Sequence, residues 1–417
     1  MRVLIVKVSA LGDVVHALPA LHFLRRQRPD VHVTWVVEQR VAGVLAGQEA
    51  IDEVIPIDTY AWRSWLRRGR VAAVVEEVWT ARRRLRSPGF DLVLDLQGNI
   101  KSGVVAGLAR ARRKVGLPRH ICREPQNTWF VGEQAEVCGS HVVDQAGEVV
   151  AHALGTEWVA PVGPVLEVAS RAIAAMAARL GAHHGPRVAF IHGASSWNKQ
   201  WPAASFTALG RHLAQEAGAQ IILPWDDADG RRRAEEIAGA LGPVAVVARS
   251  RSLAELAALL AACDLAIGGD TGPSHMAWAV GTPTVTLYGP NPSARNGPRG
   301  GYHRVLQSPV MCSPCWGRPA LVTRNLRERV PMVVAPGWPT SPSPQAALRA
   351  VEGSDEEEVR RRGQPRERSS FIVRGAGTGC PTGDFICMEA IGVGEVAAAA
   401  ERLLQGVRRS RRLEAVR

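Results

Sequence analysis

Four polar residues crowd one short turn in the stretch 263–290 and could together hold a phosphate group. Asp270, Thr271, Ser274 and His275 supply carboxylate, hydroxyl and imidazole groups there. A helix that begins at this turn would add unpaired backbone N–H groups and the positive end of its dipole, which favour the phosphates of a nucleotide diphosphate. The same residues would also be expected if Asp270 and Thr271 only capped the helix and His275 packed in a core.

The flanking segments predict the elements that would position this turn. The apolar run 265–267 predicts a buried parallel strand that breaks at the glycine pair 268–269, where the backbone can turn without steric cost. Pro273 suits the first position of a helix and Gly281 the position just after its end. The run 284–288 predicts the next strand. The turn therefore lies beyond the C-terminal end of a strand, where open α/β sheets bind ligands.

A second candidate for chemistry is Asp13, in the loop that leaves the first predicted strand at residues 2–8. The neighbouring Gly12 would let a ligand approach. A carboxylate in this loop could serve as a general base, or it could be the N-cap of a helix over 14–26. Its position in the sequence leaves both roles open.

The remainder of the chain alternates between strand and helix patterns, which predicts an α/β fold. Further strands are expected at 31–37, 54–57, 91–96, 187–192, 221–223 and 244–247, with helices around 40–45, from about 203 to 217 and at 393–404. The pattern restarts after the Pro- and Gly-rich segment 160–164, so we expect two domains, 1–165 and 183–316. Residues 317–371 carry scattered prolines and blocks of like charge, which predicts a disordered insert or an erroneous stretch. We expect the segment 380–406 to be ordered again.

The composition indicates a cytoplasmic protein with an anionic partner. The 417 residues are 46% hydrophobic, enough for substantial cores, and carry a formal net charge of +12 at pH 7. This charge favours nucleic acid, an anionic membrane surface or a phosphorylated substrate as the partner. The sequence has no run of about 18 uncharged apolar residues, which argues against a spanning helix. Residues 3–8 fit a first strand better than a signal peptide.

Tryptophan and arginine alternate in the segment 61–70, AWRSWLRRGR. A solvated basic helix face would explain the pattern, but tryptophan beside arginine also suits an anionic lipid headgroup or a sugar acid. A second polar cluster, 119–124, is less informative.

Four of the seven cysteines are patterned, and they lie on either side of the predicted insert. They are Cys312, Cys315, Cys380 and Cys387. A CxxC pair is the common half of a zinc site, so a metal or a disulfide could fix the C-terminal helix to the second domain. Reduced thiols packed near one another would explain the same arrangement.

With these residues in view, the chain resembles the lipopolysaccharide heptosyltransferases of glycosyltransferase family 9, and most closely the heptosyltransferase I branch. Six segments carry the resemblance in order: MRVLIVKVSALGDVVHALPAL at 1–21, DLVLDLQGNIKSG at 91–103, HVVD at 141–144, HGASSWNKQWP at 192–202, LPW at 223–225 and GGDTGPSHMAWAVGTPTVTLYGP at 268–290. One such motif would be weak evidence, whereas six in order are specific.

The resemblance implies a GT-B architecture, with two Rossmann-like domains facing each other across a cleft. It implies an inverting transfer of heptose from ADP-L-glycero-D-manno-heptose to the Kdo region of the lipopolysaccharide inner core. We therefore expect Kdo-lipid A as the acceptor, an anionic inner-membrane surface as a partner, and a peripheral location on its cytoplasmic face. We expect no cofactor and no metal, because the sequence lacks a paired-carboxylate metal motif.

The family's functional residues transfer onto matching positions of this chain. Asp13 matches the base and Lys199 the lysine that contacts the donor. The donor-binding positions are Ser195, Asp229, Asp270, Thr271, Gly272 and His275, and the expected acceptor-binding residues are Arg63, Arg67 and Arg123. Two positions depart from the family pattern: Ala194-Ser195 replaces a Thr-Thr pair, and Asp229 is the nearest counterpart of a glutamate.

Four alternatives remain open at this point. Within the family, the donor could be another ADP-sugar, or the enzyme could be of the heptosyltransferase II type. A nicotinamide-linked oxidoreductase would explain the sheets, but the loop after the first strand, SALGDV, lacks the Gly-x-Gly-x-x-Gly pattern. A nucleic-acid-binding protein would explain the charge, but the arginines are spread along the chain and form no recognition module, so nucleic acid is not an expected partner.

Overall fold

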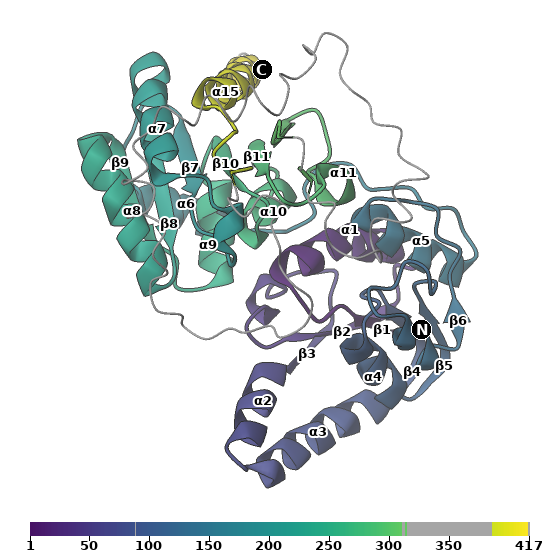
Figure 1. The fold of residues 1–417 in the computed structure, drawn as a ribbon. Coiled ribbons are helices and arrows are strands. Elements are labelled where there is room, and N and C mark those ends of the chain that lie inside the picture. The colour runs from purple at the N-terminus through teal and green to yellow at the C-terminus, as the bar shows by residue number, and fades with distance from the viewer. Residues whose placement is uncertain (88, 311–312, 315–385, 416–417) are drawn as a thin grey trace. The chain divides into compact units, whose positions relative to one another are not determined.

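Two parallel β-sheets with helices packed against them organise the chain (Figure 1). The structure is a computed structural model that describes residues 1–87, 89–310, 313–314 and 386–415. Each sheet has six strands, and every pairing between neighbouring strands is parallel. Parallel neighbours require crossover connections, which are usually helices, and this agrees with the alternation predicted from the sequence.

The first sheet is built from the N-terminal part of the chain and has the order β3-β2-β1-β4-β5-β6. Its strands are β1 (Arg2–Val6), β2 (His32–Glu38), β3 (Glu53–Ile57), β4 (Phe90–Asp95), β5 (Ala111–Gly116) and β6 (Glu133–Gln134). Its helices are α1 (Leu11–Gln27), α2 (Thr59–Arg67), α3 (Val71–Arg86), α4 (Ile100–Leu108) and α5 (Val142–Leu154), with 3-10 turns η1 (Ala42–Val44) and η2 (Pro125–Trp129).

The second sheet has the order β12-β11-β10-β7-β8-β9. Its strands are β7 (Arg187–Ile191), β8 (Gln220–Trp225), β9 (Ala245–Arg249), β10 (Leu265–Gly269), β11 (Thr284–Tyr288) and β12 (His303–Gln307). Its helices are α6 (Ser170–Arg179), α7 (Ala203–Ala217), α8 (Ala228–Leu241), α9 (Leu253–Ala261), α10 (Gly272–Ala279), α11 (Ser293–Asn296) and α15 (Val393–Ala415), with 3-10 turns η3 (Trp197–Lys199) and η4 (Gly242–Val244).

Both sheets have the Rossmann order 3-2-1-4-5-6 when their strands are counted along the chain. The order reverses between β1 and β4 in the first sheet and between β7 and β10 in the second. Ligands of such sheets bind at the carboxyl ends of the strands beside this reversal. The loops after β1, β4, β7 and β10 are therefore the places where site residues are expected.

Alternate residues of each central strand are buried on opposite faces, which explains the unbroken apolar runs. In β1, Val3 and Ile5 join one hydrophobic cluster, while Leu4 and Val6 join another. All four side chains are fully buried. A strand covered by helices on both faces needs apolar residues at every position, rather than at every second one.

The helix α15 packs on the second sheet and completes its core. Val396, Ala399, Ala400, Leu403 and Leu404 are all buried in the same cluster as strands β7 and β8. The small alanine side chains let the helix backbone approach closely. No helix among the described residues is long and apolar enough to cross a membrane.

Most predicted elements are confirmed, and two local predictions are wrong. The expected helix at 40–45 is only the 3-10 turn Ala42–Val44. The glycine pair 268–269 does not break the strand but forms the end of β10. Of the two roles left open for Asp13, that of N-cap is excluded, because α1 begins at Leu11 and Ala10 is its N-cap.

The domain boundaries 1–165 and 183–316 stay predictions. The strands of the first sheet fall within 2–134 and those of the second within 187–307. In the segment 380–406, the helix expected at 393–404 is confirmed as part of α15. The expected insert at 317–371 lies outside the described residues, as do Cys312, Cys315 and Cys380. Cys387 is described and buried.

We predict that Leu404→Ala will destabilise the second sheet, because it leaves a cavity where α15 packs on that sheet. The expected loss is about 2–5 kcal/mol of unfolding free energy. Chemical denaturation followed by tryptophan fluorescence measures it. The control is Gln405→Ala, at an exposed position of the same helix, which should change stability by less than about 0.5 kcal/mol. Equal midpoints for the two variants would contradict the packing of α15.

Candidate active site

The N-terminal turns of α1 and α10 contact each other, and two glycines make this contact possible. A Cβ atom on Gly12 would lie 2.7 Å from Cδ2 of His275, and one on Gly272 would lie 2.7 Å from Cδ2 of Leu11. Both distances are too short for any real side chain. Each helix follows a strand at the reversal point of its sheet, so the contact brings the Asp13 turn next to the Asp270 turn.

The carboxylate of Asp270 is the centre of the hydrogen-bond network in the second turn. Its Oδ1 accepts from His275 Nε2 and Asn296 Nδ2, both at 2.9 Å. Its Oδ2 accepts from Lys199 Nζ at 2.9 Å and from Asn291 Nδ2 at 2.5 Å. Four donors from three separate segments therefore meet on one buried side chain.

This network keeps Asp270 ionised. Burial alone would raise the pKa of the Asp270 carboxyl, but the hydrogen bond from His275 and the charge of Lys199 hold it well below its ordinary range. Lys199 is a quarter exposed, and two of its contacts are with Asp270, at Oδ2 and at the backbone oxygen. Because an ammonium group has three N–H donors, one remains available to an anionic ligand.

Close packing of two strand ends brings Lys199 to Asp270. A Cβ on Gly269 would lie 2.4 Å from the backbone oxygen of Lys199, and a Cβ on Gly268 would lie 2.7 Å from that of Ile191. The glycine pair thus lets the loop after β7 pack directly on the end of β10. The two glycines therefore let two backbone segments approach closely, and they do not form the turn expected from the sequence.

The first turn of α10 provides backbone donors beside this lysine. Thr271 is the N-cap and Gly272 the first helical residue, while Pro273 has no N–H to satisfy. The hydroxyl of Ser274 donates to the Gly269 carbonyl at 2.7 Å and lies 3.2 Å from the Thr271 hydroxyl. The unpaired N–H groups of a helix start favour an anion at this position.

Asp13 is the third residue of α1, and its Oδ2 accepts from the Ala10 backbone N–H at 3.0 Å. The loop before it is held by Gln97, whose Oε1 accepts from the N–H groups of Val8 and Ser9 at 2.6 and 3.2 Å. The segment after β4 therefore fixes the segment after β1. The half-buried carboxylate of Asp13 is held at the start of the helix, close to the α10 turn.

A second buried carboxylate, Asp95, explains the Gln-Gly-Asn segment that follows β4. Burial raises the pKa of Asp95, although hydrogen bonds from Asn127 and Ser102 and from the N–H of Gln97 oppose the shift. The distances from these donors are 2.6, 3.0 and 2.9 Å. Asp95 is fully buried and orders the loop, so we assign it a structural role.

Three histidines and a tryptophan pack behind the site. The ring of His16 lies 4.4 Å from that of His275, 6.1 Å from that of His141 and 5.5 Å from that of Trp278. Burial holds the pKa of His16 well below its ordinary value and lowers that of His141 to about 4. His16 and His141 are therefore neutral at physiological pH and can pack against other rings.

The HVVD segment joins the first part of the chain to the loop after β11. His141 Nε2 lies 2.9 Å from the Gly297 carbonyl, and Asp144 forms a two-pronged ion pair with Arg299. Neither residue stood among the expected site residues. Together they hold the loop that carries Asn291 and Asn296.

The structure brings some of the expected site residues together and places others elsewhere. It joins Lys199, Asp270 and His275 directly, with Thr271 and Gly272 in the same turn. Ser195 is exposed in the loop before Lys199, and Asp229 is exposed on α8, where it pairs with Arg232. Arg67 and Arg123 are exposed on α2 and on the loop before η2, and Arg63 lies on α2 with its side chain outside the described residues. The roles of these residues stay predictions.

The sequence analysis missed Asn291, Asn296 and Gln97. Their positions were a usable signal. Gln97 follows β4, a strand at a reversal point, and Asn291 and Asn296 follow β11, which pairs with the reversal-point strand β10. Amide side chains in such loops are candidates for holding a neighbouring carboxylate.

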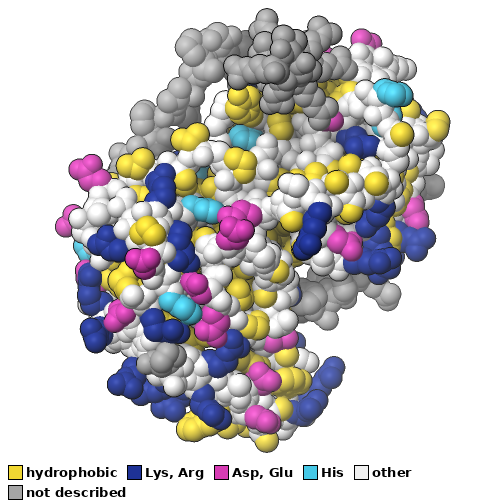
Figure 2. Space-filling view, turned by 180° about the vertical axis from the view of Figure 1, so that it is seen from behind, with side chains coloured by type: hydrophobic (Ala, Val, Ile, Leu, Met, Phe, Trp, Pro, Cys, Tyr) yellow, Lys and Arg dark blue, Asp and Glu magenta, His cyan; other side chains and the backbone are white. Residues whose placement is uncertain are grey.

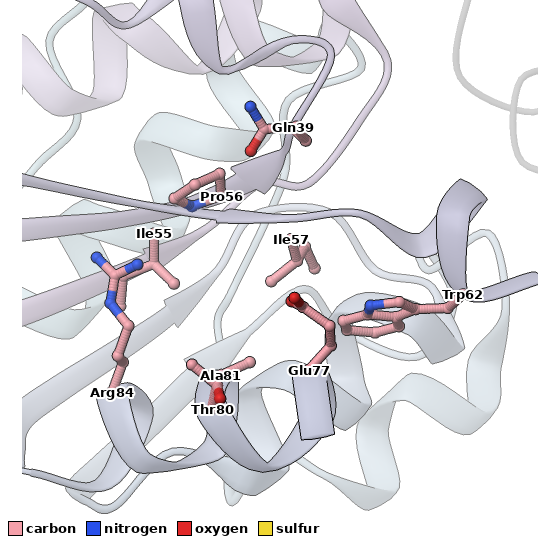
Figure 3. Close-up of a pocket in the computed structure, with 9 residues that line it drawn as sticks. All are labelled: Gln39, Ile55, Pro56, Ile57, Trp62, Glu77, Thr80, Ala81 and Arg84. Carbon is pink, nitrogen blue, oxygen red and sulfur yellow. The ribbon is translucent and has the colours of Figure 1, made fainter. Parts of the chain in front are cut away.

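A separate cavity of about 230 Å³ lies between β3 and the helices α2 and α3 (Figure 3). It is lined by Gln39, Ile55, Pro56, Ile57, Trp62, Glu77, Thr80, Ala81 and Arg84. None of these residues belongs to the Asp270 network. Among the described residues, no group of three or more His, Cys, Asp or Glu side chains could hold a metal ion.

Two sheets of Rossmann order, with the Asp13 turn of one beside the Asp270 turn of the other, form a GT-B fold. The profile of glycosyltransferase family 9 (heptosyltransferase) matches residues 78–324. Lipopolysaccharide heptosyltransferase 1 of Pseudomonas aeruginosa is 35% identical over 322 residues, which are 76% of this chain and 86% of that protein. The chain belongs to glycosyltransferase family 9.

Solved structures agree with this assignment. The E. coli heptosyltransferase WaaC with ADP-2-deoxy-2-fluoro heptose is 28% identical, with a TM-score of 0.64 over 79% of this chain and 100% of that chain. A family 9 glycosyltransferase from Veillonella parvula has a TM-score of 0.69 at 19% identity, over 97% of both chains, and shows the fold alone. The predicted α/β GT-B architecture is confirmed, and the oxidoreductase and nucleic-acid alternatives are set aside.

We predict that Asp270→Asn will destabilise the protein at pH 7 by about 2 kcal/mol, since it leaves Lys199 without its charged partner. The pKa of Asp270 is depressed in the folded state, so its contribution is present above about pH 3.9 and is lost as pH falls further. The gap between variant and wild type should therefore shrink by up to about 1.4 kcal/mol per pH unit below that point.

Denaturation midpoints between pH 7 and pH 3 measure this dependence. Asp226→Asn, at an exposed aspartate of the loop before α8, is the control and should change stability little at either pH. A gap that stays constant down to pH 3 would show that the ionised carboxylate does not stabilise the site.

Proposed function

We propose that the protein transfers heptose from ADP-L-glycero-D-manno-heptose to the Kdo region of the lipopolysaccharide inner core. The contact of the Asp13 turn with the Lys199–Asp270 turn carries this proposal, because it provides an acceptor-side base beside a diphosphate site. Membership in family 9 supports the transfer of heptose. WaaC, whose solved structure contains an ADP-heptose analogue, supports the donor.

The reaction is a single displacement with inversion at the anomeric carbon. The acceptor hydroxyl oxygen attacks this carbon from one face while the bond to the diphosphate oxygen breaks on the other. Asp13 accepts the proton of the acceptor hydroxyl as the new glycosidic bond forms. Asp13 can take this proton because only its Oδ2 accepts a hydrogen bond from the Ala10 N–H and its side chain is partly exposed.

The departing ADP gains negative charge as the bond to the sugar breaks. Lys199 and the first N–H groups of α10 lie where they can offset this charge. Asp270 holds Lys199 in place, and Asn291 and Asn296 hold Asp270. Preorganised groups of this kind need no rearrangement during the reaction, which makes them effective in lowering the barrier.

The acceptor side is served by basic residues of the first part of the chain. We assign Arg63, Arg67 and Arg123 to the carboxylates and phosphates of Kdo-lipid A. A lipid acceptor places the enzyme peripherally on the cytoplasmic face of the inner membrane, where its positive charge suits an anionic surface. Ser195 and Asp229 are assigned to the donor sugar.

A coupled assay of ADP release tests the function. We expect release with ADP-heptose and Kdo-lipid A together, and little release when either is omitted. Turnover with a different ADP-sugar at an equal or greater kcat/KM would replace the donor assignment. Turnover only with an acceptor that already carries heptose would indicate the heptosyltransferase II type.

We predict that Asp13→Asn lowers kcat by about 10²–10⁴ and leaves the affinity for ADP nearly unchanged, since the base acts on the acceptor. The asparagine oxygen can still accept from the Ala10 N–H, so the loop keeps its structure. Asp13→Ala, which removes that acceptor too, should lose as much activity. The base assignment fails if Asp13→Asn keeps more than about a tenth of the wild-type rate.

The variant Lys199→Met tests the donor side. We predict that it lowers kcat by about 10²–10³ and weakens ADP binding, because the ammonium group contacts the diphosphate. Titration calorimetry with ADP separates it from Asp13→Asn, which should bind ADP like the wild type. Equal ADP affinity for Lys199→Met and wild type would refute the contact.

A further inference from the structure

The helix α3 carries apolar residues on the face that points away from the sheet. Val71, Val75 and Trp79 are 54, 61 and 57% exposed and recur every four residues, so they form one stripe. Leu85, at a different angle around the helix, is buried in a core cluster. The stripe is therefore a second apolar face, separate from the one that packs on the protein.

Three exposed polar residues of α3 lie along the cavity beside β3. Glu77, Thr80 and Arg84 line the cavity between this helix and the strand, as Figure 3 shows, together with Ala81. Arg84 also forms an ion pair with Glu53 of β3 at 3.0 Å.

The inward side of α3 is also apolar, since Val74, Val78 and Ala81 are half-buried and Leu85 is buried, so the helix has two apolar faces where a surface helix usually has one. The outward stripe therefore needs an explanation other than packing of the protein core.

The neighbouring helix α2 also exposes large apolar side chains. Leu66 is 53% and Tyr60 39% exposed, and the short turn 68–70 joins α2 to α3. Figure 1 shows the two helices as a hairpin at the edge of the first sheet. We call residues 59–86 the α2–α3 hairpin.

Arginines accompany the exposed apolar residues. On α3, Arg82 and Arg86 continue the face of the stripe toward the end of the helix. The guanidinium of Arg82 lies 5.1 Å from the ring of Trp79, and that of Arg70 lies 5.6 Å from the ring of Trp65. Residues 58–86 contain eight arginines and three acidic residues. Hydrophobic and basic side chains gather at the lower end of Figure 2, the end at which Figure 1 places the hairpin.

We propose that the α2–α3 hairpin docks on an anionic lipid bilayer, with Val71, Val75 and Trp79 in the boundary between headgroups and acyl chains. Its arginines contact the lipid phosphates. Apolar residues flanked by basic ones are the pattern of a helix that lies in the membrane interface, and tryptophan suits this depth. The inference rests on the proposed function only in that a lipid acceptor gives the enzyme a reason to dock.

Docking through this hairpin has a consequence for the acceptor. Arg67 lies at the end of α2, and Arg63 lies one turn earlier on the same helix. A bilayer bound by the hairpin would therefore present its headgroups near α2, the helix whose sequence contains the two arginines assigned to Kdo-lipid A. The same element would hold the membrane and receive the sugar acid at its surface.

The test is flotation with vesicles that contain no acceptor, either phosphatidylcholine alone or phosphatidylcholine with phosphatidylglycerol. We expect binding to the anionic vesicles only, weakened by salt. The variant Val75→Glu/Trp79→Glu should reduce the partition coefficient at least about tenfold, because two charged groups would enter the interface. Its control is Val159→Glu/Val162→Glu, which adds the same charge at two exposed apolar positions outside the hairpin and should bind within about twofold of wild type.

Arginine variants test the electrostatic part. The pair Arg82→Gln/Arg86→Gln should weaken binding by about fivefold per arginine and lower the salt dependence. The control is Arg231→Gln/Arg232→Gln on α8, expected to bind like the wild type. All variants are compared by circular dichroism, and Val75→Glu alone serves if the double variant fails to fold.

Several outcomes would overturn the inference. They are absence of wild-type binding to anionic vesicles, equal binding by Val75→Glu/Trp79→Glu and its control, or a wild-type dimer that this variant dissociates. The last outcome would show that a second copy of the chain covers the stripe. ADP release with a deacylated, water-soluble acceptor is measured in parallel and should be unchanged in the hairpin variants. If the wild type releases no ADP with this soluble acceptor, the proposed function is refuted. Vesicle binding is a separate measurement and can still support the docking of the hairpin.

Discussion

The ionised carboxylate of Asp270 is the interaction on which the site depends. A buried charge is costly unless hydrogen-bond donors and opposite charge surround it. Here Lys199, His275, Asn291 and Asn296 meet that requirement, and each comes to Asp270 from a segment near the end of a strand or from the helix α10. The requirement therefore fixes the relative positions of three loops. The first turn of α10, where a diphosphate would bind, is ordered as a result.

Glycines allow these loops to come together. Gly12 and Gly272 let the starts of α1 and α10 touch, and Gly269 lets the Lys199 loop lie on β10. Each position is crowded by another part of the chain, so even one added methyl group would displace a neighbour. The geometry of the site therefore depends on glycine at these positions as much as on the polar groups that would contact a donor.

Much of the fold could be predicted from the sequence because the buried parallel strands are short unbroken apolar runs. The turn around Asp270 could be predicted too, since its polar residues lie between clear strand and helix signals. The positions of Asn291 and Asn296 after a strand end made them candidates, but their common partner could not be predicted, because the two amides reach Asp270 through the pairing of β10 with β11. The outward apolar stripe of α3 was missed for a similar reason. Apolar residues at 71, 75 and 79 suit a helix equally well whether the stripe faces the sheet or faces away from it, and only the structure shows which side is covered.

The packing of α15 has a consequence for the order in which the chain can fold during synthesis. The cluster around Leu4, Val93 and Val131 uses only residues up to Val131, so it can form while the ribosome is still adding the rest. The cluster around Phe190 and Ile221 includes Leu403 and Leu404, more than 200 residues later than Phe190 in the sequence. Domains generally fold as units, from the N-terminus onward, during translation. One apolar face of the second sheet must therefore stay open until residue 404 has been synthesised, longer than the faces in the other two clusters, whose last buried residues are Val131 and Ala279.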